Sequence, residues 1–174
     1  MALMFSRLAH NFIKNGYFPT DDRTVAGVLS AIDIGAQSIR ILDPCCGEGC
    51  ALAEVKRHLT ECGASVSALG VEFDPERAWH AKTLLDAALH ADIHDVMISQ
   101  RSTGLLFLNP PYGDVVSDKA GTGSRKKADR LEKVFFRRTL PLLQFGGVLV
   151  LIVPYYIMDA EFANMIARNF ERVA

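Results

Sequence analysis

The sequence predicts an α/β fold with a doubly wound, mostly parallel β-sheet, and three observations favour it. Short apolar runs alternate along the chain with segments whose apolar residues recur at helical spacing. A glycine-bearing turn at residues 46–49 follows the first of these runs. Residues 148–153 form a continuous apolar run, which is typical of a parallel strand covered on both faces. In such sheets, ligands bind outside the carboxyl ends of the strands.

Size and composition indicate a single domain over residues 1–174. Hydrophobic residues make up 49% of the chain, which is enough for a core. The formal net charge is −1, so the chain lacks the basic excess of an autonomous DNA-binding protein. Its four cysteines do not form the pattern of a disulfide scaffold, and no apolar run is long enough to cross a bilayer. We therefore expect a cytoplasmic protein with no membrane partner.

Periodicity, capping residues and glycine or proline breaks locate the individual elements. An N-terminal helical segment, residues 1–35, holds a helix at 3–15 and a second helix that Thr20 and Asp21 precede. Strands are predicted at 38–42, 66–73, 87–91, 104–108 and 148–153, with the start of another at 170–174. Later helices are predicted at 51–62, at 75–85, at 131–145 before a Gly146-Gly147 turn, and at 159–168.

A glycine-rich turn leaves the first predicted strand through an acidic residue. It reads Asp43-Pro44-Cys45-Cys46-Gly47-Glu48-Gly49. Gly47 and Gly49 allow the backbone to approach a ligand closely and to adopt positive φ. This turn alone leaves the ligand open, because dinucleotide sites use the same device, although the complete GxGxxG spacing is absent here.

Two further carboxylates follow predicted strands. Glu72 lies at the end of the second strand, where a carboxylate can accept both hydroxyl hydrogens of a ribose. Asp92 follows the third strand, where it can receive an adenine amino group while Ile93 lies beside the ring. Each acid by itself is more readily a helix cap or a solvated loop charge. Their order at successive strand ends, together with Asp43, favours a ribose-bearing ligand.

The most specific motif is Asn109-Pro110-Pro111-Tyr112, directly after the fourth strand. An amino group on an aromatic ring is a poor nucleophile, because its lone pair is delocalised into the ring. The Asn109 side-chain oxygen and the Pro110 carbonyl can accept both amino hydrogens and thereby free that lone pair. Tyr112 offers a face on which a planar target can stack. The alternative is a rigid turn that only ends the strand.

Other kinds of site find less support. The five histidines show no ligand spacing that pairs with the cysteines, so we predict no metal. The connection at 113–130 is long and polar, and we expect it to be mobile. Its basic residues Arg125, Lys126, Lys127 and Arg130 could guide phosphates, although such a run is more often a solvated face.

These motifs resemble those of class I methyltransferases that use S-adenosylmethionine, particularly the amino-methyltransferase group that contains the N6-adenine DNA methyltransferases. The turn at 43–49 resembles the DPxCGxG cofactor motif, and residues 109–112 match the catalytic NPPY. Residues 16–20 resemble a segment that packs over the methionine part of the cofactor, but with Phe-Pro-Thr in a changed order. The resemblance implies a Rossmann-like fold and S-adenosylmethionine as the cofactor.

The resemblance also assigns roles to individual residues. Catalytic roles fall to Asn109, Pro110, Pro111 and Tyr112. Cofactor binding falls to Phe18, Pro19, Thr20, Asp43, Pro44, Cys45, Cys46, Gly47, Gly49, Glu72, Phe73, Asp92, Ile93 and Asn109. The family sheet continues with a sixth and an antiparallel seventh strand, and this sequence ends as the sixth begins. We expect the last strands and the target-recognition region to be absent, so that a partner domain or subunit supplies recognition.

Three functions remain open at this point. The first is methylation of the adenine N6 amino group in DNA, with the base flipped into the cleft, and RNA is nearly as compatible. The second is methylation of a protein glutamine, because release-factor methyltransferases also use NPPY. The third is a non-catalytic module that binds adenosylmethionine within a larger assembly.

Overall fold

The computed structural model describes residues 17–32, 38–113 and 130–174. The helix predicted at 3–15 and the basic residues Arg125, Lys126 and Lys127 lie outside the described residues. In the described part of the chain, no helix is long and apolar enough to cross a membrane.

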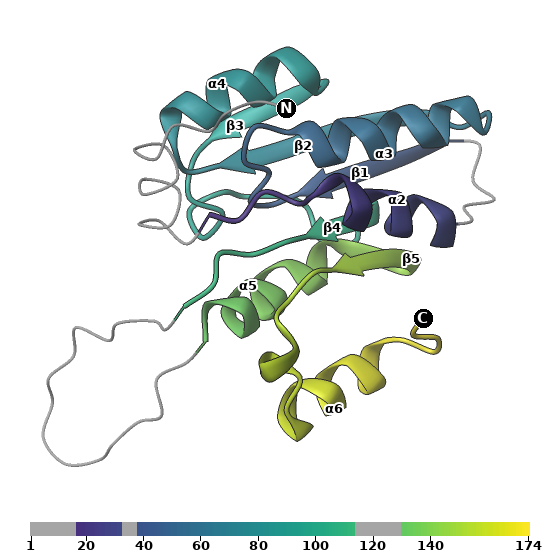
Figure 1. Cartoon of the computed structure of the whole chain (residues 1–174), viewed down its shortest axis with the longest axis vertical. Helices are drawn as coiled ribbons and strands as arrows, with labels where there is room; N and C mark the ends of the chain where they lie inside the picture. Colours follow the sequence, from purple (N-terminus) through teal and green to yellow (C-terminus); the bar gives the residue numbers. More distant parts are fainter. Residues whose placement is uncertain (1–16, 33–37, 114–129) are drawn as a thin grey trace, which may run out of the picture.

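The strands of the described residues form one parallel sheet in the order β3-β2-β1-β4-β5 (Figure 1). This confirms the predicted fold class. The chain order reverses between β1 and β4, so the carboxyl ends of these two strands form the switch point at which such sheets bind ligands. The strands are β1 (Ser38–Asp43), β2 (Ser65–Glu72), β3 (Ala87–His90), β4 (Thr103–Leu108) and β5 (Leu143–Leu151).

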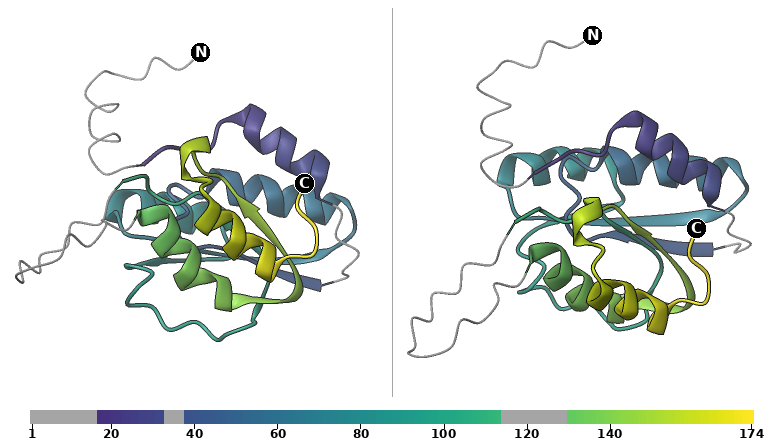
Figure 2. Two further views of the ribbon diagram at one scale, coloured as in Figure 1. Left: turned by 90° about the horizontal axis from the view of Figure 1, so that it is seen from below. Right: turned by 60° about the horizontal axis from the view of Figure 1, so that its bottom comes forward.

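Helices cover both faces of the sheet (Figure 2). Three of them begin after an aspartate, Asp21, Asp74 or Asp159, whose side chain accepts backbone N–H groups of the first turn. The helices are α2 (Asp22–Ala31), α3 (Cys50–Glu61), α4 (Pro75–Leu84), α5 (Leu131–Thr139) and α6 (Ala160–Asn169).

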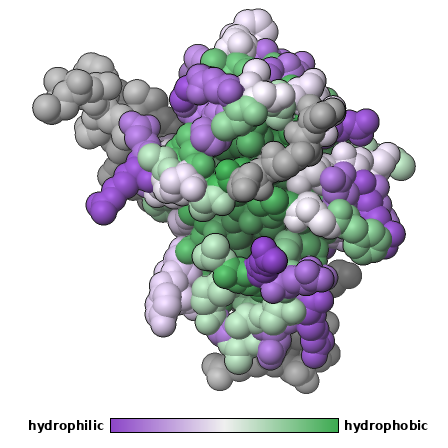
Figure 3. Space-filling model, turned by 90° about the vertical axis from the view of Figure 1, so that its right-hand side faces the viewer, coloured by the Kyte–Doolittle hydropathy of each residue, from purple (hydrophilic) through white to green (hydrophobic). Residues whose placement is uncertain are grey.

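The core consists of two layers, one on each side of the sheet. Ile41 and Leu105 face the layer that contains α3 and α4, whereas their neighbours Leu42 and Leu106 face the layer that contains Phe135 of α5. This alternation follows from the period of two in a β-strand. Hydrophobic side chains gather in the middle of the face shown in Figure 3, and hydrophilic ones surround them.

The prediction of one helix over 131–145 and a turn at Gly146-Gly147 was wrong. Helix α5 ends at Thr139, a 3₁₀ turn at Leu140–Leu142 follows, and β5 begins at Leu143. Pro141 has no N–H to donate to a longer α-helix, which explains the early end. The two glycines lie inside β5, where the register shifts between Thr103 and Leu105 of β4.

The strand predicted to begin at 170–174 is also absent from the described structure. Phe170 has extended backbone angles, but its N–H bonds back to Ile166 of α6 rather than to the sheet. Its side chain packs against the cores beside α5 and α6 instead. Among the described residues, the sheet therefore ends at β5.

Candidate functional site

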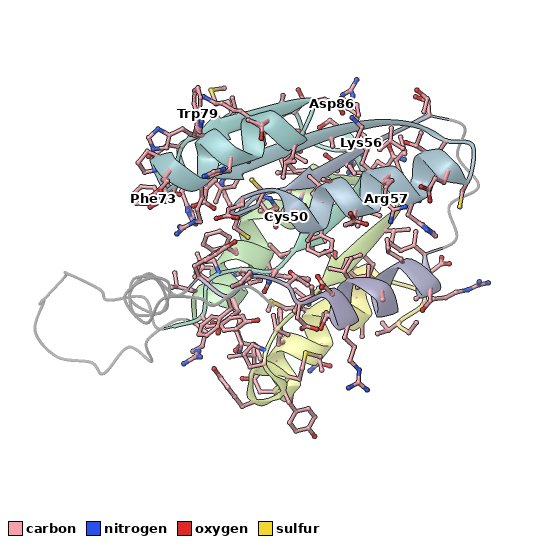
Figure 4. The ribbon with its side chains drawn as sticks, turned by 45° about the horizontal axis from the view of Figure 1, so that its top comes forward. Cys50, Lys56, Arg57, Phe73, Trp79 and Asp86 are labelled. Carbon is pink, nitrogen blue, oxygen red and sulfur yellow. The ribbon has the colours of Figure 1, made fainter. Side chains whose placement is uncertain are left out.

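A pocket of about 350 Å³ opens at the carboxyl ends of the strands, within the size range of about 300–1,000 Å³ that is typical of ligand sites. Nine residues predicted for the site line it: Phe18, Pro44, Cys45, Glu72, Phe73, Asp92, Ile93, Asn109 and Pro111. The walls come from the segment before α2, from the ends of β1, β2, β3 and β4, and from α4 and α5. Figure 4 shows Phe73 at this end of the molecule, beside the start of α4.

Asp43 stabilises the glycine-rich turn through a hydrogen bond to its backbone. Its Oδ1 accepts the Cys45 N–H at 2.9 Å, and the residue is buried. Burial raises the pKa of Asp43 to about 7, and the nearby charge of Glu72 adds to the shift. The Cys45 thiol donates to the Asn109 carbonyl at 3.2 Å, which ties the turn to the end of β4.

The two glycines of the turn allow close contact with different neighbours. Gly47 has a φ of 57°, and a Cβ placed on it would lie 2.4 Å from the Tyr17 ring. Gly49 has a φ of 86°, and its Cβ would lie 3.2 Å from the Cα of Ala81 in α4. Gly47 therefore faces the pocket wall formed by Tyr17, whereas Gly49 lets α3 pack closely against α4.

Glu72 lies almost completely buried at the end of β2, where four protein N–H groups meet it. Its Oε2 accepts the Gly47 amide at 2.9 Å. Its Oε1 accepts the Asp74 amide at 2.8 Å and two donors of Arg77, Nη2 at 2.8 Å and Nε at 3.1 Å. The carboxylate thus joins the turn, the start of α4 and an arginine side chain.

Tyr17 and Arg77 form a stacked pair beside Glu72. The Arg77 guanidinium lies 4.4 Å from the centre of the Tyr17 ring. Burial raises the pKa of Tyr17 to about 12, although the backbone amide of Glu48 bonds to its hydroxyl and opposes the shift. The sequence reasoning assigned no role to either residue. The position of Arg77, five residues after Glu72 in the first turns of a helix, is the signal that could have found it.

Asp92 and Ile93 lie on the far side of the pocket from the turn. Asp92 Oδ1 accepts the backbone N–H of His94 at 2.9 Å and contacts His94 Nδ1 at 2.8 Å. Partial burial opposes ionisation, but the contacts with His94 hold the pKa of Asp92 below its usual value. Ile93 is buried in the core and also reaches the pocket wall.

Asn109 connects two segments of the site through opposite ends of its side-chain amide. Its Nδ2 donates to the Phe18 carbonyl and to Thr20 Oγ1, both at 2.9 Å. Its Oδ1 accepts the Tyr112 hydroxyl at 3.1 Å. The Tyr112 ring stacks on Phe18, with centroids 5.0 Å apart and planes 20° apart. The amide oxygen therefore points toward the hydroxyl of Tyr112, whose ring belongs to the stacked pair.

The remaining predicted residues do not belong to the pocket lining. Thr20 anchors Asn109, and Tyr112 contacts Phe18. Asp43, Pro19, Cys46, Gly47, Gly49 and Pro110 complete that set. The lining also includes six residues that the sequence reasoning did not name for the site: Tyr17, Asp74, Pro75, Arg77, Ala91 and Phe135.

Two predictions about partners can be compared with the described residues. Within residues 17–32, 38–113 and 130–174, no group of three or more His, Cys, Asp or Glu side chains is arranged to hold a metal ion. Arg130, the described member of the basic run, lies at the start of α5 and pairs with the buried Glu132 at 3.2 Å and with the Tyr156 hydroxyl at 3.3 Å.

Comparison with solved structures identifies methyltransferase folds. A protein of Listeria monocytogenes assigned to the class I S-adenosylmethionine-dependent methyltransferases aligns with a TM-score of 0.69 at 19% identity, over 86% of this chain and 50% of that one. The methyltransferase subunit of a type I restriction-modification system of Streptococcus thermophilus aligns with a TM-score of 0.60 at 16% identity, over 82% of this chain and 36% of that one. This chain spans half or less of the length of these two structures.

The sequence itself gives the family. No curated protein matches it significantly. A family model described as an uncharacterised methyltransferase family, DUF6094, matches residues 1–174. The parallel sheet and the pocket at its switch point agree with that description. The chain therefore belongs to the DUF6094 family of methyltransferases.

Proposed function

We propose that this protein uses S-adenosylmethionine to methylate the exocyclic N6 amino group of adenine in DNA. The observation that carries the proposal is the orientation of Asn109 at the switch point. Its amide nitrogen is bound by Phe18 and Thr20, so its oxygen is directed toward the Tyr112 hydroxyl. An amide fixed in this way presents an acceptor next to an aromatic side chain, and a planar amino compound can use both features.

The hydrogen-bond acceptors and apolar side chains of the pocket fit the proposed cofactor. Glu72 stands at the end of β2 for a ribose, Asp92 follows β3 for an adenine amino group, and Phe73 and Ile93 provide apolar surface for the adenine ring. The backbone of Gly47 lies at the same pocket, between Glu72 and Tyr17. When bound, S-adenosylmethionine supplies an electrophilic methyl group.

In this proposal, the NPPY residues bind the target amino group through two acceptor oxygens and one aromatic ring. The Asn109 oxygen has two lone pairs and accepts one hydroxyl here, so it can also accept an amino hydrogen. The carbonyl of the buried Pro110 is the second acceptor in this proposal. Two acceptors favour a pyramidal amino nitrogen whose lone pair projects from the ring plane. Tyr112 and Phe18 stack on each other, and in this proposal the base stacks on an outer face of the pair, a contact worth about 1–3 kcal/mol.

DNA is the proposed substrate for two reasons. The site favours a planar aromatic amine over a flexible one, because its aromatic rings are stacked and anchored. The structural neighbour from Streptococcus thermophilus is a subunit of a restriction-modification system. Because the chain has a net charge of −1, we propose that a partner domain or subunit supplies most of the affinity for DNA.

The test is transfer of a labelled methyl group from S-adenosylmethionine to DNA, RNA and protein, followed by identification of the methylated product. N6-methyladenine in DNA is the expected product of the wild-type chain. Asn109→Ala removes the acceptor and should reduce transfer by at least about 100-fold, the size of effect seen when one transition-state hydrogen-bonding group is removed. Arg57→Met is the matched control, since Arg57 lies farther along α3 from the Phe73 end and pairs only with Glu54 and Glu61 in the described structure (Figure 4).

The alternatives predict different products. Methylglutamine in a protein, without any methyladenine, would contradict the adenine assignment and support the second candidate. Cofactor binding without transfer to DNA, RNA or protein would support a binding module. Equal transfer by Asn109→Ala and the wild-type chain would contradict the role of Asn109.

A further inference from the structure

The four hydrogen bonds of Glu72 are unevenly divided between its two oxygens. An ionised carboxylate offers about four lone-pair sites on its two oxygens. The Gly47 amide is the one donor on Oε2, whereas Oε1 receives three: the Asp74 amide and the Nε and Nη2 atoms of Arg77. The side chains of Glu72 and Arg77 are only 5% and 12% exposed, so little water competes at this contact.

A ribose diol brings two further donors to the same carboxylate. Oε2 can accept one hydroxyl, but Oε1 already has three donors for its two lone pairs, so donors must leave Oε1 before it can accept the other. The Gly47 amide belongs to the turn after β1, and the Asp74 amide belongs to the residue that caps α4, so both are fixed by the fold. Arg77 alone contributes through a side chain, and it contributes two donors. Displacement of Arg77 leaves the Asp74 amide as the one protein donor on Oε1 and so opens the site that the second hydroxyl requires.

Arg77 has a second carboxylate to which it can turn. Its Nη1 lies 4.0 Å from Asp74 Oδ2, so the guanidinium can keep a charged partner after it leaves Glu72. Tyr17 would be affected by the same movement, because it stacks on Arg77 and its ring lies where a Cβ of Gly47 would be. One stacked unit therefore occupies both the acid and the glycine that the proposed cofactor would contact.

We propose that Arg77 acts as a latch on Glu72, the carboxylate proposed to bind the ribose. A ribose diol displaces the Arg77 guanidinium from Glu72, and Tyr17 moves with it away from Gly47. This inference rests on the proposed cofactor but not on the identity of the methyl acceptor. It makes Arg77 a residue that weakens binding of adenosyl ligands, because each binding event must first break its contact with Glu72.

The test measures the affinity of the purified chain for S-adenosylhomocysteine and for its 2′,3′-dideoxy analogue by calorimetry. Arg77→Met keeps an unbranched apolar side chain for stacking on Tyr17 and removes both donors. Its affinity for S-adenosylhomocysteine should rise by about tenfold or more, since a hydrogen bond to a charged group contributes enough to account for that factor. Its affinity for the dideoxy analogue, which has no diol to exchange for Arg77, should stay unchanged.

Two further variants complete the experiment. Arg77→Lys keeps the positive charge but loses the two-pronged contact, and it should give an intermediate gain for the diol ligand. It also serves as the test if the methionine variant does not fold. Arg57→Met, on the outer face of α3, should bind both ligands as the wild-type chain does.

The outcomes separate this inference from the proposed function. Weaker binding of S-adenosylhomocysteine by Arg77→Met and Arg77→Lys would overturn the latch and show that Arg77 positions the acid, while the cofactor assignment would stand. Equal gains for the two ligands would also overturn it, because the diol would then play no part. Failure of the wild-type chain to bind S-adenosylhomocysteine would overturn the cofactor assignment and the latch together.

Discussion

Thr20 contacts the NPPY motif through a single hydrogen bond. Its Oγ1 accepts from Asn109 Nδ2, which also donates to the Phe18 carbonyl. The hydroxyl therefore helps to decide which end of the amide faces Tyr112. A change at Thr20 tests the orientation of Asn109 without altering the acceptor itself.

We predict that Thr20→Val slows methyl transfer while Thr20→Ser retains it. Valine has nearly the shape of threonine but cannot accept the Asn109 hydrogen, whereas serine keeps the hydroxyl. The loss of one hydrogen bond should also lower the free energy of unfolding by about 0.5–1.5 kcal/mol. Initial rates with labelled cofactor and urea unfolding of the three proteins provide the measurements. Equal rates for valine and serine would show that the Phe18 carbonyl alone orients the amide.

The raised pKa of Asp43 leads us to predict that the free energy of unfolding depends on pH. Its pKa rises from 3.8 to about 7 on folding, chiefly through burial, so the folded protein holds this proton more tightly than the unfolded chain. The contribution of Asp43 to stability is therefore greatest at low pH, falls as the pH rises between these two values, and is constant above them. Asp43→Asn keeps an acceptor for the Cys45 amide and cannot ionise.

The expected result is that Asp43→Asn becomes more stable, relative to the wild-type chain, at about pH 8 than at about pH 5. Urea unfolding of both proteins at the two pH values isolates the contribution of this one carboxyl, because every other titrating group is shared. An unchanged difference between the two proteins would mean that Asp43 keeps the same protonation state across this range.

At the level of elements, the sequence predicted the alternation of strands and helices but not the path from α5 into β5. Glycine pairs usually indicate turns, so Gly146-Gly147 was placed between elements. In the structure, parallel pairing with β4 overrides this local signal, and a shift in register accommodates the two residues. The carboxylates and NPPY fall at strand ends as expected, because strand ends follow from periodicity. The Arg77 contact depends on where the first turn of α4 points, and periodicity does not give that direction.

The glycines of β5 give a stability prediction. A Cβ on Gly147 would lie 2.9 Å from the Gln144 carbonyl oxygen and 3.0 Å from that of Gly104. Leu143 Cδ1 would lie 2.7 Å away as well, and the two oxygens are backbone atoms, so Gly147→Ala should destabilise the protein by about 1–3 kcal/mol. Gly27→Ala is the contrasting variant, since Gly27 lies on exposed helix α2 with nothing within 4 Å. It should stabilise the protein by about 0.5–1 kcal/mol. Equal unfolding midpoints for the two variants would contradict the crowding in β5.

At the scale of the whole molecule, the pocket joins parts of the chain that are far apart in sequence. Asn109 at the end of β4 holds the segment before α2, and Glu72 at the end of β2 joins the turn after β1 to α4. A ligand at this point contacts several elements at once. Its binding energy should therefore stabilise the folded chain as a unit rather than one local segment.

We accordingly predict that S-adenosylhomocysteine raises the melting temperature and that a nicotinamide dinucleotide does not. A ligand at 100 times its dissociation constant stabilises the folded state by about 2.7 kcal/mol, which corresponds to roughly 5–10 °C for a domain of this size. Differential scanning calorimetry with each ligand provides the measurement. The dinucleotide is the informative control, because the glycine-rich turn and Glu72 are features that its binding sites share. An equal shift with both ligands would show that the pocket recognises only the adenosine portion, whereas a shift with the dinucleotide alone would contradict the proposed cofactor.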